Sequence, residues 1–315
     1  MAYHFSRDDK SVQSAVHRLA LEQIEGALAD TRDPARAHAA AIHSARKRVK
    51  KLRGLLRLVQ PVLDGSRQES AVLRDATRHI AGLRDAEVRL RTFDTLVAPL
   101  PASAGLAALR EGLGARVATA REPVALAESL AAFREGLHEV HGRVPGWHIS
   151  GRGFEALEGG LADTWRRARR GLKTSRAAFA GDFDATPFHD WRRPVKDHWY
   201  QARLLTPVWP AMMAAHVAAT DELGELLGDH NDLDVLTAQL SGTVTGAGGE
   251  ALPAVAALAL DRRRALALDR RRALAGRALA LGTRLFAGRA DDLTARWGIW
   301  WEVWQSRGNG NGNGG

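Results

Sequence analysis

A run of cations without any acid follows His43 in the sequence. On a helix, like charges four residues apart cost about 0.2–0.5 kcal/mol for each pair, and no local acid offsets that repulsion here. A bound anion would offset it, so the pattern predicts an anion-binding helix rather than an ordinary solvated one. The seven basic residues of the run are Arg46, Lys47, Arg48, Lys50, Lys51, Arg53 and Arg57.

Two further basic segments lie in the second half of the sequence. His189 leads a copy of the first pattern that contains Pro194 and Asp197, and another basic run precedes it. Several basic helices on one body would form a surface for an extended polyanion, whereas a single phosphate needs only one small pocket. The run that precedes His189 contains Arg166, Arg167, Arg169, Arg170, Lys173 and Arg176, and the copy contains Arg192, Arg193, Lys196 and Arg203.

The spacing in the first run predicts a stripe of cations on one helix face. From His43 to Arg57 the basic residues recur every three or four positions, a period that brings side chains to the same side of a helix. At 1.5 Å per residue the stripe would be about 20 Å long. Trp199 occupies the position in the second copy that Arg53 has in the first, so we expect a thinner stripe there.

The two histidines, His43 and His189, allow more than one interpretation. Each could donate a hydrogen bond to an anion, hold a contact between helices, or act as a metal ligand or phosphate-accepting nucleophile. We favour anion contact, because no carboxylate or further histidine stands at a ligand spacing in both copies. Asp85 and Asp232 lack a partner carboxylate and are better suited to orient arginines. We expect no catalytic residue, no metal site and no cofactor.

Composition restricts the class of protein further. The 315 residues include 45 Lys and Arg against 36 Asp and Glu, a net charge of +9, and no cysteine. Without cysteine there is no disulfide framework, cysteine zinc site or thiol nucleophile. The first residues lack the apolar core of a signal peptide, and no apolar stretch reaches the roughly 20 residues of a membrane span. We expect a cytoplasmic protein with a polyanionic partner and no membrane partner.

The elements that must position these residues are helices. Ala, Leu, Arg and Glu dominate, which favours helix, and no alternating β-branched run predicts a strand. Pro34 after Asp33 and Pro187 after Thr186 favour capped helix starts. The expected helices cover residues 11–30, 34–60, 66–96, 103–121, 123–142, 154–180, 187–205, 208–240, 251–287 and 290–305, with a linker at 145–153 and a glycine-rich loop at 241–249.

An internal repeat relates the two halves of the chain. His43 aligns with His189 at an offset of 146 residues, and one inserted residue then aligns Asp85 with Asp232. The repeat predicts an all-α fold with two homologous helical-bundle halves, related by a pseudo-two-fold axis, around a basic central groove. The expected parts are a first half at 1–145, a second half at 154–306 and a disordered tail at 307–315.

A shorter tandem repeat adds six arginines near the C-terminus. The octapeptide Leu-Asp-Arg-Arg-Arg-Ala-Leu-Ala occurs at 260–267 and again at 268–275. An exposed helix with a duplicated segment is the favoured interpretation, and a further wall of the anion site is the alternative.

These motifs together resemble the CHAD domain family, the conserved histidine α-helical domains. The first half carries His43-x-x-Arg-Lys-x-Val-Lys-x-Leu-Arg, and the second carries His189-x-x-Arg-Arg-x-Val-Lys. The segments Leu83-Arg-Asp-Ala-Glu-Val88 and Trp165-Arg-Arg-Ala-Arg-Arg170 also fit the family pattern. The resemblance extends over roughly residues 11–305, nearly the whole chain.

The resemblance implies an all-helical protein that binds inorganic polyphosphate and can associate with polyphosphate granules, and we expect it not to be an enzyme. Two alternatives stay open: a helical protein that binds nucleic acid, and a regulatory partner of an enzyme that processes phosphate polymers. The residues expected to bind polyphosphate are His43, Arg46, Lys47, Lys50, Lys51, Arg53, Arg57, Arg166, Arg169, Arg170, Lys173, His189, Arg192, Arg193, Lys196 and Arg203.

Overall fold

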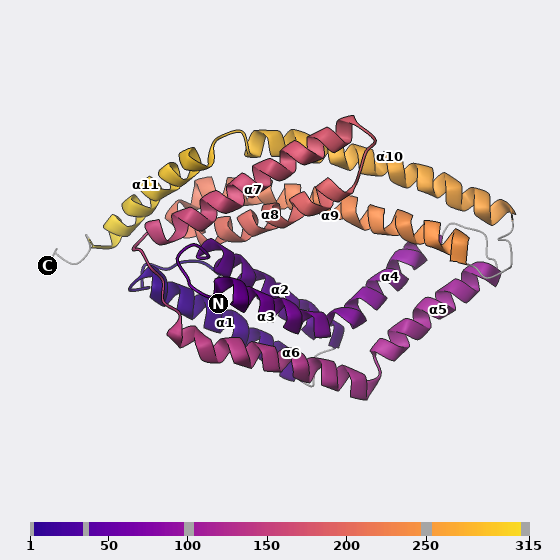
Figure 1. The fold of residues 1–315 in the computed structure, drawn as a ribbon, viewed down its shortest axis with the longest axis horizontal. Helices are drawn as coiled ribbons and strands as arrows, with labels where there is room; N and C mark the ends of the chain where they lie inside the picture. The colour runs from indigo at the N-terminus through magenta and orange to yellow at the C-terminus, as the bar shows by residue number, and fades with distance from the viewer. Residues whose placement is uncertain (1–2, 34–37, 98–103, 247–253, 310–315) are drawn as a thin grey trace.

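The computed structural model describes residues 3–33, 38–97, 104–246 and 254–309, most of which are helical (Figure 1). These residues contain no β-strand, which confirms the all-α fold; one isolated bridge pairs Leu63 with Ile149. The helices are α1 (Val12–Arg32), α2 (His38–Leu58), α3 (Ser66–His79), α4 (Ala81–Val97), α5 (Ala104–Ala120), α6 (Pro123–Arg143), α7 (Glu155–Ala180), α8 (Thr186–Leu204), α9 (Pro210–Gly246), α10 (Ala254–Leu285) and α11 (Ala290–Asn309), with short 3₁₀ turns η1 (Val144–Gly146) and η2 (Thr206–Val208).

The largest difference from the expected elements is a break in the helix predicted over 66–96. The chain leaves helical geometry at Ile80 (φ −99°, ψ 8°), which separates α3 from α4. Ile80 is 1% exposed and belongs to the hydrophobic core. Burial of this side chain offsets the helical hydrogen bonds lost at the break, and no proline or turn motif marks the position in the sequence.

Two predicted irregular segments are partly helical. Helix α9 continues to Gly246, so the loop predicted over 241–249 is helical in its first six residues, and its last three lie outside the described residues. The six residues include no proline, and α9 packs along α10. Helix α11 likewise continues to Asn309, into the tail predicted at 307–315.

The N-terminal cap of α8 is not the residue that the sequence predicted. Thr186 is the first helical residue rather than the cap, and the cap position is Ala185. The carboxylate of Asp184 accepts a hydrogen bond from the backbone N–H of Thr186 (2.9 Å), so an aspartate performs the role expected of the threonine. The helix start predicted at Asp33-Pro34 lies at the edge of residues 34–37, which are outside the described part.

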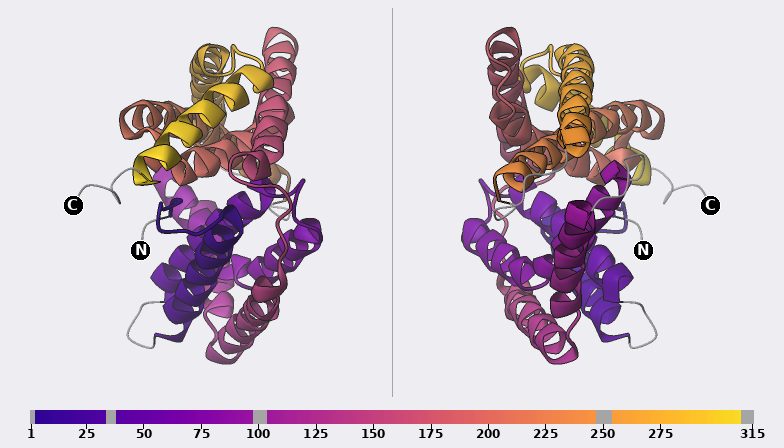
Figure 2. Two further views of the ribbon diagram at one scale, coloured as in Figure 1. Left: turned by 90° about the vertical axis from the view of Figure 1, so that its left-hand side faces the viewer. Right: turned by 90° about the vertical axis from the view of Figure 1, so that its right-hand side faces the viewer.

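The two halves of the chain repeat one packing scheme. Helices α1 and α2 pack closely in the first half, as α7 and α8 do in the second; α3 packs on α2 and α6, and α9 packs on α8 and α10. Figures 1 and 2 show the first half, from indigo to magenta, beside the second half, which ends in yellow. This order of contacts fits homologous halves, while the pseudo-two-fold axis and the domain boundaries stay predictions.

Two glycines let the halves approach closely, with α2 packed against both α7 and α8. A Cβ atom at Gly54 of α2 would lie 2.8 Å from the Cβ of Tyr200 on α8. A Cβ atom at Gly160 of α7 would overlap the carbonyl of Leu58. A larger residue at either position would force the helices apart, so these glycines keep the basic faces of α2 and α8 next to each other.

One hydrophobic core extends through both halves. Leu19, Ile24 and Phe133 in the first half and Trp191 and Phe286 in the second are at most 2% exposed. Burying side chains of this size stabilises the fold by about 1.5–3 kcal/mol each, which gives the cationic helices a rigid support. None of the helices in the described part of the chain has the length and apolar composition needed to cross a membrane.

Candidate anion-binding site

A basic cleft lies between α2 and α3 on one side and α7 and α8 on the other. It consists of two adjoining hollows of about 910 Å³ and about 300 Å³, which share Arg53, Arg57 and Arg193 in their walls. Two carboxylates, Asp163 and Asp197, also line it. We call the combined hollow the basic cleft; its twelve cationic residues are Lys50, Arg53, Arg57, Arg67, Arg74, Arg78, Arg166, Arg167, Arg170, Arg192, Arg193 and Lys196.

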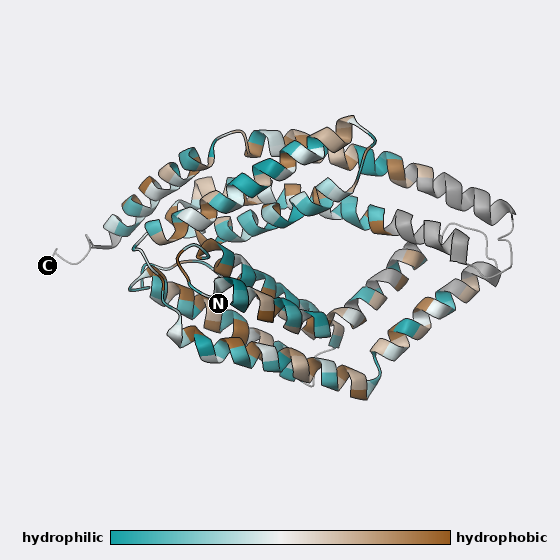
Figure 3. Cartoon of the chain, viewed as in Figure 1, coloured by the Kyte–Doolittle hydropathy of each residue, from teal (hydrophilic) through white to brown (hydrophobic). Residues whose placement is uncertain are grey.

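Helix α2 contributes its last two turns to the cleft. Lys50, Arg53 and Arg57 line the hollow, while Leu52 and Leu55 on the other side of the helix are at most 1% exposed in the core. The helical period thus separates an apolar face from a cationic one. Hydrophilic residues recur along α2, α7 and α8 in Figure 3, in agreement with this division.

Helix α8 contributes both its histidine and its cations. His189, Arg192, Arg193 and Lys196 line the smaller hollow. The helix runs from Thr186 to Leu204 without interruption, although Pro194 lies inside it. Pro194 therefore does not remove this copy of the basic helix from the site.

Helix α3 supplies three arginines that the sequence analysis missed: Arg67, Arg74 and Arg78. Acids are interspersed among them, so the segment resembles an ordinary solvated helix. Their spacing of seven and four residues nevertheless places them on one helix face, together with the small lining residues Ser70 and Ala71. That face is the signal that could have identified them; Arg167 of α7 was missed as well.

Seven of the expected binding residues do not line the cleft. His43, Arg46 and Lys47 lie on earlier turns of α2, and Arg169 and Lys173 of α7 are not among the lining residues. Lys51 and Arg203 meet at the N-terminal segment instead. The structure brings together the other nine expected residues: Lys50, Arg53, Arg57, Arg166, Arg170, His189, Arg192, Arg193 and Lys196.

The ring of Tyr3 explains the position of Lys51 and Arg203. The Lys51 ammonium lies 5.3 Å and the Arg203 guanidinium 6.0 Å from the centre of this ring. Tyr3 Oη donates a hydrogen bond to the carbonyl of Lys51 (2.7 Å). Burial lowers the pKa of the Lys51 ammonium, and repulsion from Arg203 lowers it further. These two cations stabilise the packing of the N-terminal segment on α2 and α8.

Several cleft arginines lack a compensating acid. In the described part of the chain, no carboxylate lies within ion-pair distance of Arg53, Arg67, Arg170 or Arg193. Burial lowers the pKa of the Arg53 guanidinium, and repulsion from Arg57 lowers it further; Arg53 Nε is buried without a hydrogen-bond partner among the described residues. Because arginine stays protonated in proteins, this geometry concentrates positive charge. A bound anion would reduce the repulsion between these guanidinium groups.

Other cleft cations already have partners. Arg57 of α2 forms an ion pair with Asp197 of α8, which links the two halves across the cleft. Lys196 contacts two carboxylates of α9, Asp221 at 3.0 Å and Glu225 at 2.6 Å. Part of the charge on α8 is therefore neutralised. Arg74 and Arg78 of α3 and Arg166 of α7 also contact carboxylates, whereas among the described residues Arg67 and Arg170 do not.

His189 of α8 lies beside α9. His189 Nδ1 is within hydrogen-bond distance of Asn231 Oδ1, which orients the ring while its other nitrogen remains available. Throughout the described residues, no group of three or more His, Asp or Glu side chains could hold a metal ion. The arrangement of the cleft suits electrostatic binding of an extended anion.

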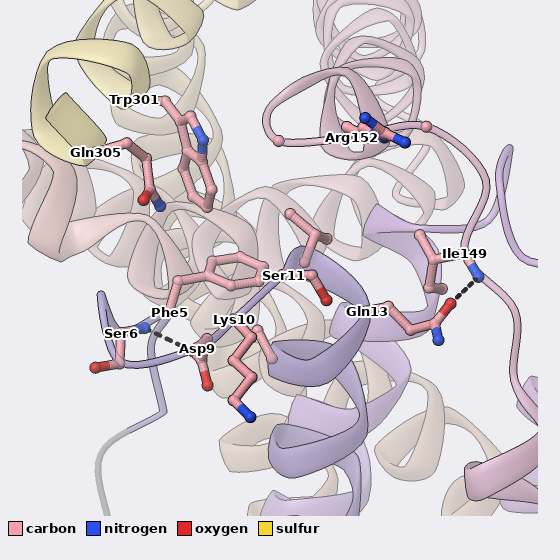
Figure 4. A pocket seen from close by; sticks show the side chains of 14 residues that line it. Phe5, Ser6, Asp9, Lys10, Ser11, Gln13, Ile149, Arg152, Trp301 and Gln305 are labelled. Carbon is pink, nitrogen blue, oxygen red and sulfur yellow. Dashed lines mark hydrogen bonds between the residues drawn. The ribbon is translucent and has the colours of Figure 1, made fainter. Parts of the chain in front are cut away.

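A different hollow, of about 590 Å³, lies where the N-terminal segment, the start of α1, the connection before α7 and helix α11 meet (Figure 4). Phe5 and Trp301 form its apolar part, and Lys10, Arg152 and Asp9 are its charged lining residues. With two cations and one acid, this hollow is a poor match for a polyanion.

The chain is similar to one known family and to a solved structure that bears the same name. The family model described as CHAD domain matches residues 15–241, which include every cationic residue of the basic cleft. The crystal structure of the CHAD domain from the plant Ricinus communis matches with a TM-score of 0.55 and 18% identity, over 92% of this chain and 96% of that chain. The comparison with curated proteins gave no match.

Proposed function

This chain belongs to the CHAD domain family, and from that premise we propose that it binds inorganic polyphosphate along the basic cleft. The family is linked to polyphosphate-related functions. The observation that carries the proposal is the excess of twelve cationic side chains over two carboxylates in one continuous cleft. Binding in this way would also allow the protein to associate with polyphosphate granules.

The dimensions of the cleft favour a polymer over a single phosphate. Arg67 and Arg78 stand at opposite ends of the α3 face, about 16 Å apart at 1.5 Å per residue. Both line the same hollow. A chain of linked phosphates could contact cations along this whole distance, whereas one phosphate could contact only a few of them.

Binding would be electrostatic and would involve no covalent step. Arginines would contact phosphate oxygens with two parallel hydrogen bonds, and lysines would act as point charges. Each neutralised phosphate would release condensed counterions, so affinity should fall steeply as salt concentration rises, as it does for nucleic acids. We propose binding without turnover, so prolonged incubation with polyphosphate should release no orthophosphate.

The cleft is poorly equipped for base stacking, which argues against the nucleic-acid alternative. Tyr200 is the aromatic residue among the described residues of its lining, and it is 8% exposed. Single-stranded nucleic acids usually gain about 1–3 kcal/mol per base from exposed aromatic platforms. Polyphosphate should therefore displace a labelled oligonucleotide at physiological salt; the reverse order of affinity would favour nucleic acid as the ligand.

The test compares cations inside the cleft with cations outside it. The double variant Arg53→Gln/Arg193→Gln should bind labelled polyphosphate about 100-fold more weakly, because each lost charge-assisted hydrogen bond costs about 1.5–3 kcal/mol. The matched control, Lys47→Gln/Arg169→Gln, removes the same net charge from exposed residues outside the cleft. Fluorescence anisotropy at fixed salt would measure both; equal losses in the two variants would contradict binding in the cleft.

A further inference from the structure

Exposed apolar side chains gather at one place on the second half. Of the seven large hydrophobic residues that are exposed in the described part of the chain, four lie just before α9, in its first turn or on α11. Their exposed fractions are 45% for Trp209, 49% for Met212, 61% for Ile299 and 47% for Val303. Trp300 joins the two elements, since its ring centre lies 4.9 Å from that of Trp209. We call these five residues the apolar patch.

Helix α11 carries large apolar side chains on its outer face as well as on its inner face, with the exposed acid Glu302 between Ile299 and Val303. Trp297, Trp301 and Trp304 form the inner face and are 4–6% exposed in the core. Ile299 and Val303 stand four residues apart on the outer face, with Trp300 beside them. Core packing accounts for the inner face only. An outer face with exposed large apolar residues indicates an interaction surface.

A cationic hollow of about 310 Å³ adjoins the apolar patch. Met212 and Trp300 belong to both, and Arg284, Arg289 and Arg296 provide the positive charge. Arg284 and Arg296 have no ion pair or side-chain hydrogen bond with any described residue. The acid in the lining, Asp292, is engaged, because it accepts a hydrogen bond from the backbone N–H of Arg289 (3.0 Å).

We propose that this face docks on a membrane surface that contains anionic phospholipids. The phosphate of a head group would enter the hollow between Arg284 and Arg296, and the apolar patch would enter the interfacial layer of the bilayer. Tryptophan, arginine and aliphatic side chains on one face are the combination that binds such a layer without crossing it. This proposal departs from the sequence-based expectation of no membrane partner.

The charge and polarity of the surface favour a lipid over other occupants. Polyphosphate has no apolar part and would leave Ile299 and Val303 in water. A symmetric contact with a second copy of the chain would bring two sets of three guanidinium groups together, with strong repulsion. An anionic lipid layer satisfies both the guanidinium groups and the apolar side chains at once.

Vesicle co-sedimentation of the full chain tests the proposal. Vesicles of phosphatidylcholine with phosphatidylglycerol should bind the protein, and vesicles of phosphatidylcholine alone should not. Arg284→Gln/Arg296→Gln should weaken binding about 25-fold, or about fivefold per arginine, which corresponds to about 1 kcal/mol per cation near an anionic surface. Ile299→Ser/Val303→Ser should weaken it about tenfold, because both side chains would leave the interfacial layer.

Matched controls distinguish the loss of this surface from the loss of any exposed positive charge or apolar side chain. Arg116→Gln and Val124→Ser change exposed residues elsewhere and should leave vesicle binding unchanged, as should the cleft variant Arg53→Gln/Arg193→Gln. Thermal unfolding would verify that every variant is folded. Three results would overturn the proposal: no binding to anionic vesicles, loss of binding in the cleft variant alone, or a dimer in light scattering that Ile299→Ser/Val303→Ser dissociates.

Discussion

Two cations of the basic cleft, Arg53 of α2 and Lys196 of α8, lie in different electrostatic surroundings. On α2, Arg53 has no carboxylate within ion-pair distance in the described part of the chain, and burial lowers its pKa. On α8, Lys196 contacts Asp221 and Glu225 and also lies 4.7 Å from the ring centre of Trp199. The number of cations on a helix therefore does not determine its capacity for anions; the neighbouring helices determine how much of that charge is left for a ligand.

The largest effect on polyphosphate affinity is expected when one cation on each helix is replaced in turn. Arg53→Gln should weaken polyphosphate binding at least about tenfold, since it removes an unpaired guanidinium that contributes about 1.5 kcal/mol or more. Lys196→Gln should weaken binding by about threefold or less, because its charge is already shared with Asp221 and Glu225. Isothermal titration calorimetry with both variants would measure the ratio; a larger loss for Lys196→Gln would reverse the comparison.

The halves should also differ in their response to acid. The three histidines whose pKa burial lowers, within the described residues, are His198, His216 and His230, all on α8 or α9; for His216 and His230 the value is about 4. Between pH 6.5 and about 4 the unfolded chain takes up protons that the folded chain does not. The free energy of unfolding should therefore fall as pH decreases, by about 1 kcal/mol per histidine at pH 5.5 relative to pH 7.5.

Hydrogen exchange at the two pH values would locate this loss. Protection should decrease in α8 and α9 before it decreases in α1 and α2. The variant His230→Phe retains an aromatic ring beside Phe188, where the two rings now stack at 4.8 Å, and should reduce the pH dependence. The same pH dependence in variant and parent would show that His230 is not responsible.

A smaller change in polyphosphate affinity is expected when the ion pair that crosses the cleft is removed. Asp197→Asn releases Arg57 from its partner, adds one available cation, and should strengthen polyphosphate binding about threefold. Asp163→Asn is the control, because Asp163 is 62% exposed and contacts Arg166 on the same helix; its effect should be weaker. Anisotropy titrations of the two variants at the same salt would rank them, and unchanged binding by Asp197→Asn would imply that Arg57 does not contact the ligand.

Most of the helices could be predicted from the sequence, because helix-forming residues favour helix, and prolines end it, through local interactions. It did not reveal the break at Ile80, which depends on burial of one side chain in a distant core. Nor did it reveal that α9 stays helical to Gly246.

The site was predictable only in part for a related reason. Runs of cations identified α2, α7 and α8, but the run is wider than the strip of helix that faces the cleft, so Lys47 and Lys51 were included. Arg74 and Arg78 of α3 were overlooked because Asp75 lies between them and contacts both. In the tandem octapeptide, Arg271 is 5% exposed and contacts Asp234 at 2.8 Å, which makes this member of the repeat a structural residue.

Gly160 has no charge and lines no hollow of the basic cleft, yet it controls the spacing between opposing guanidinium groups. It touches the carbonyl of Leu58, next to Arg57, so the size of one residue on α7 determines how near α2 can come. A methyl group there would act as a wedge and widen the gap that a phosphate chain must bridge. The proposed binding of polyphosphate would thus depend on a residue that does not line the cleft.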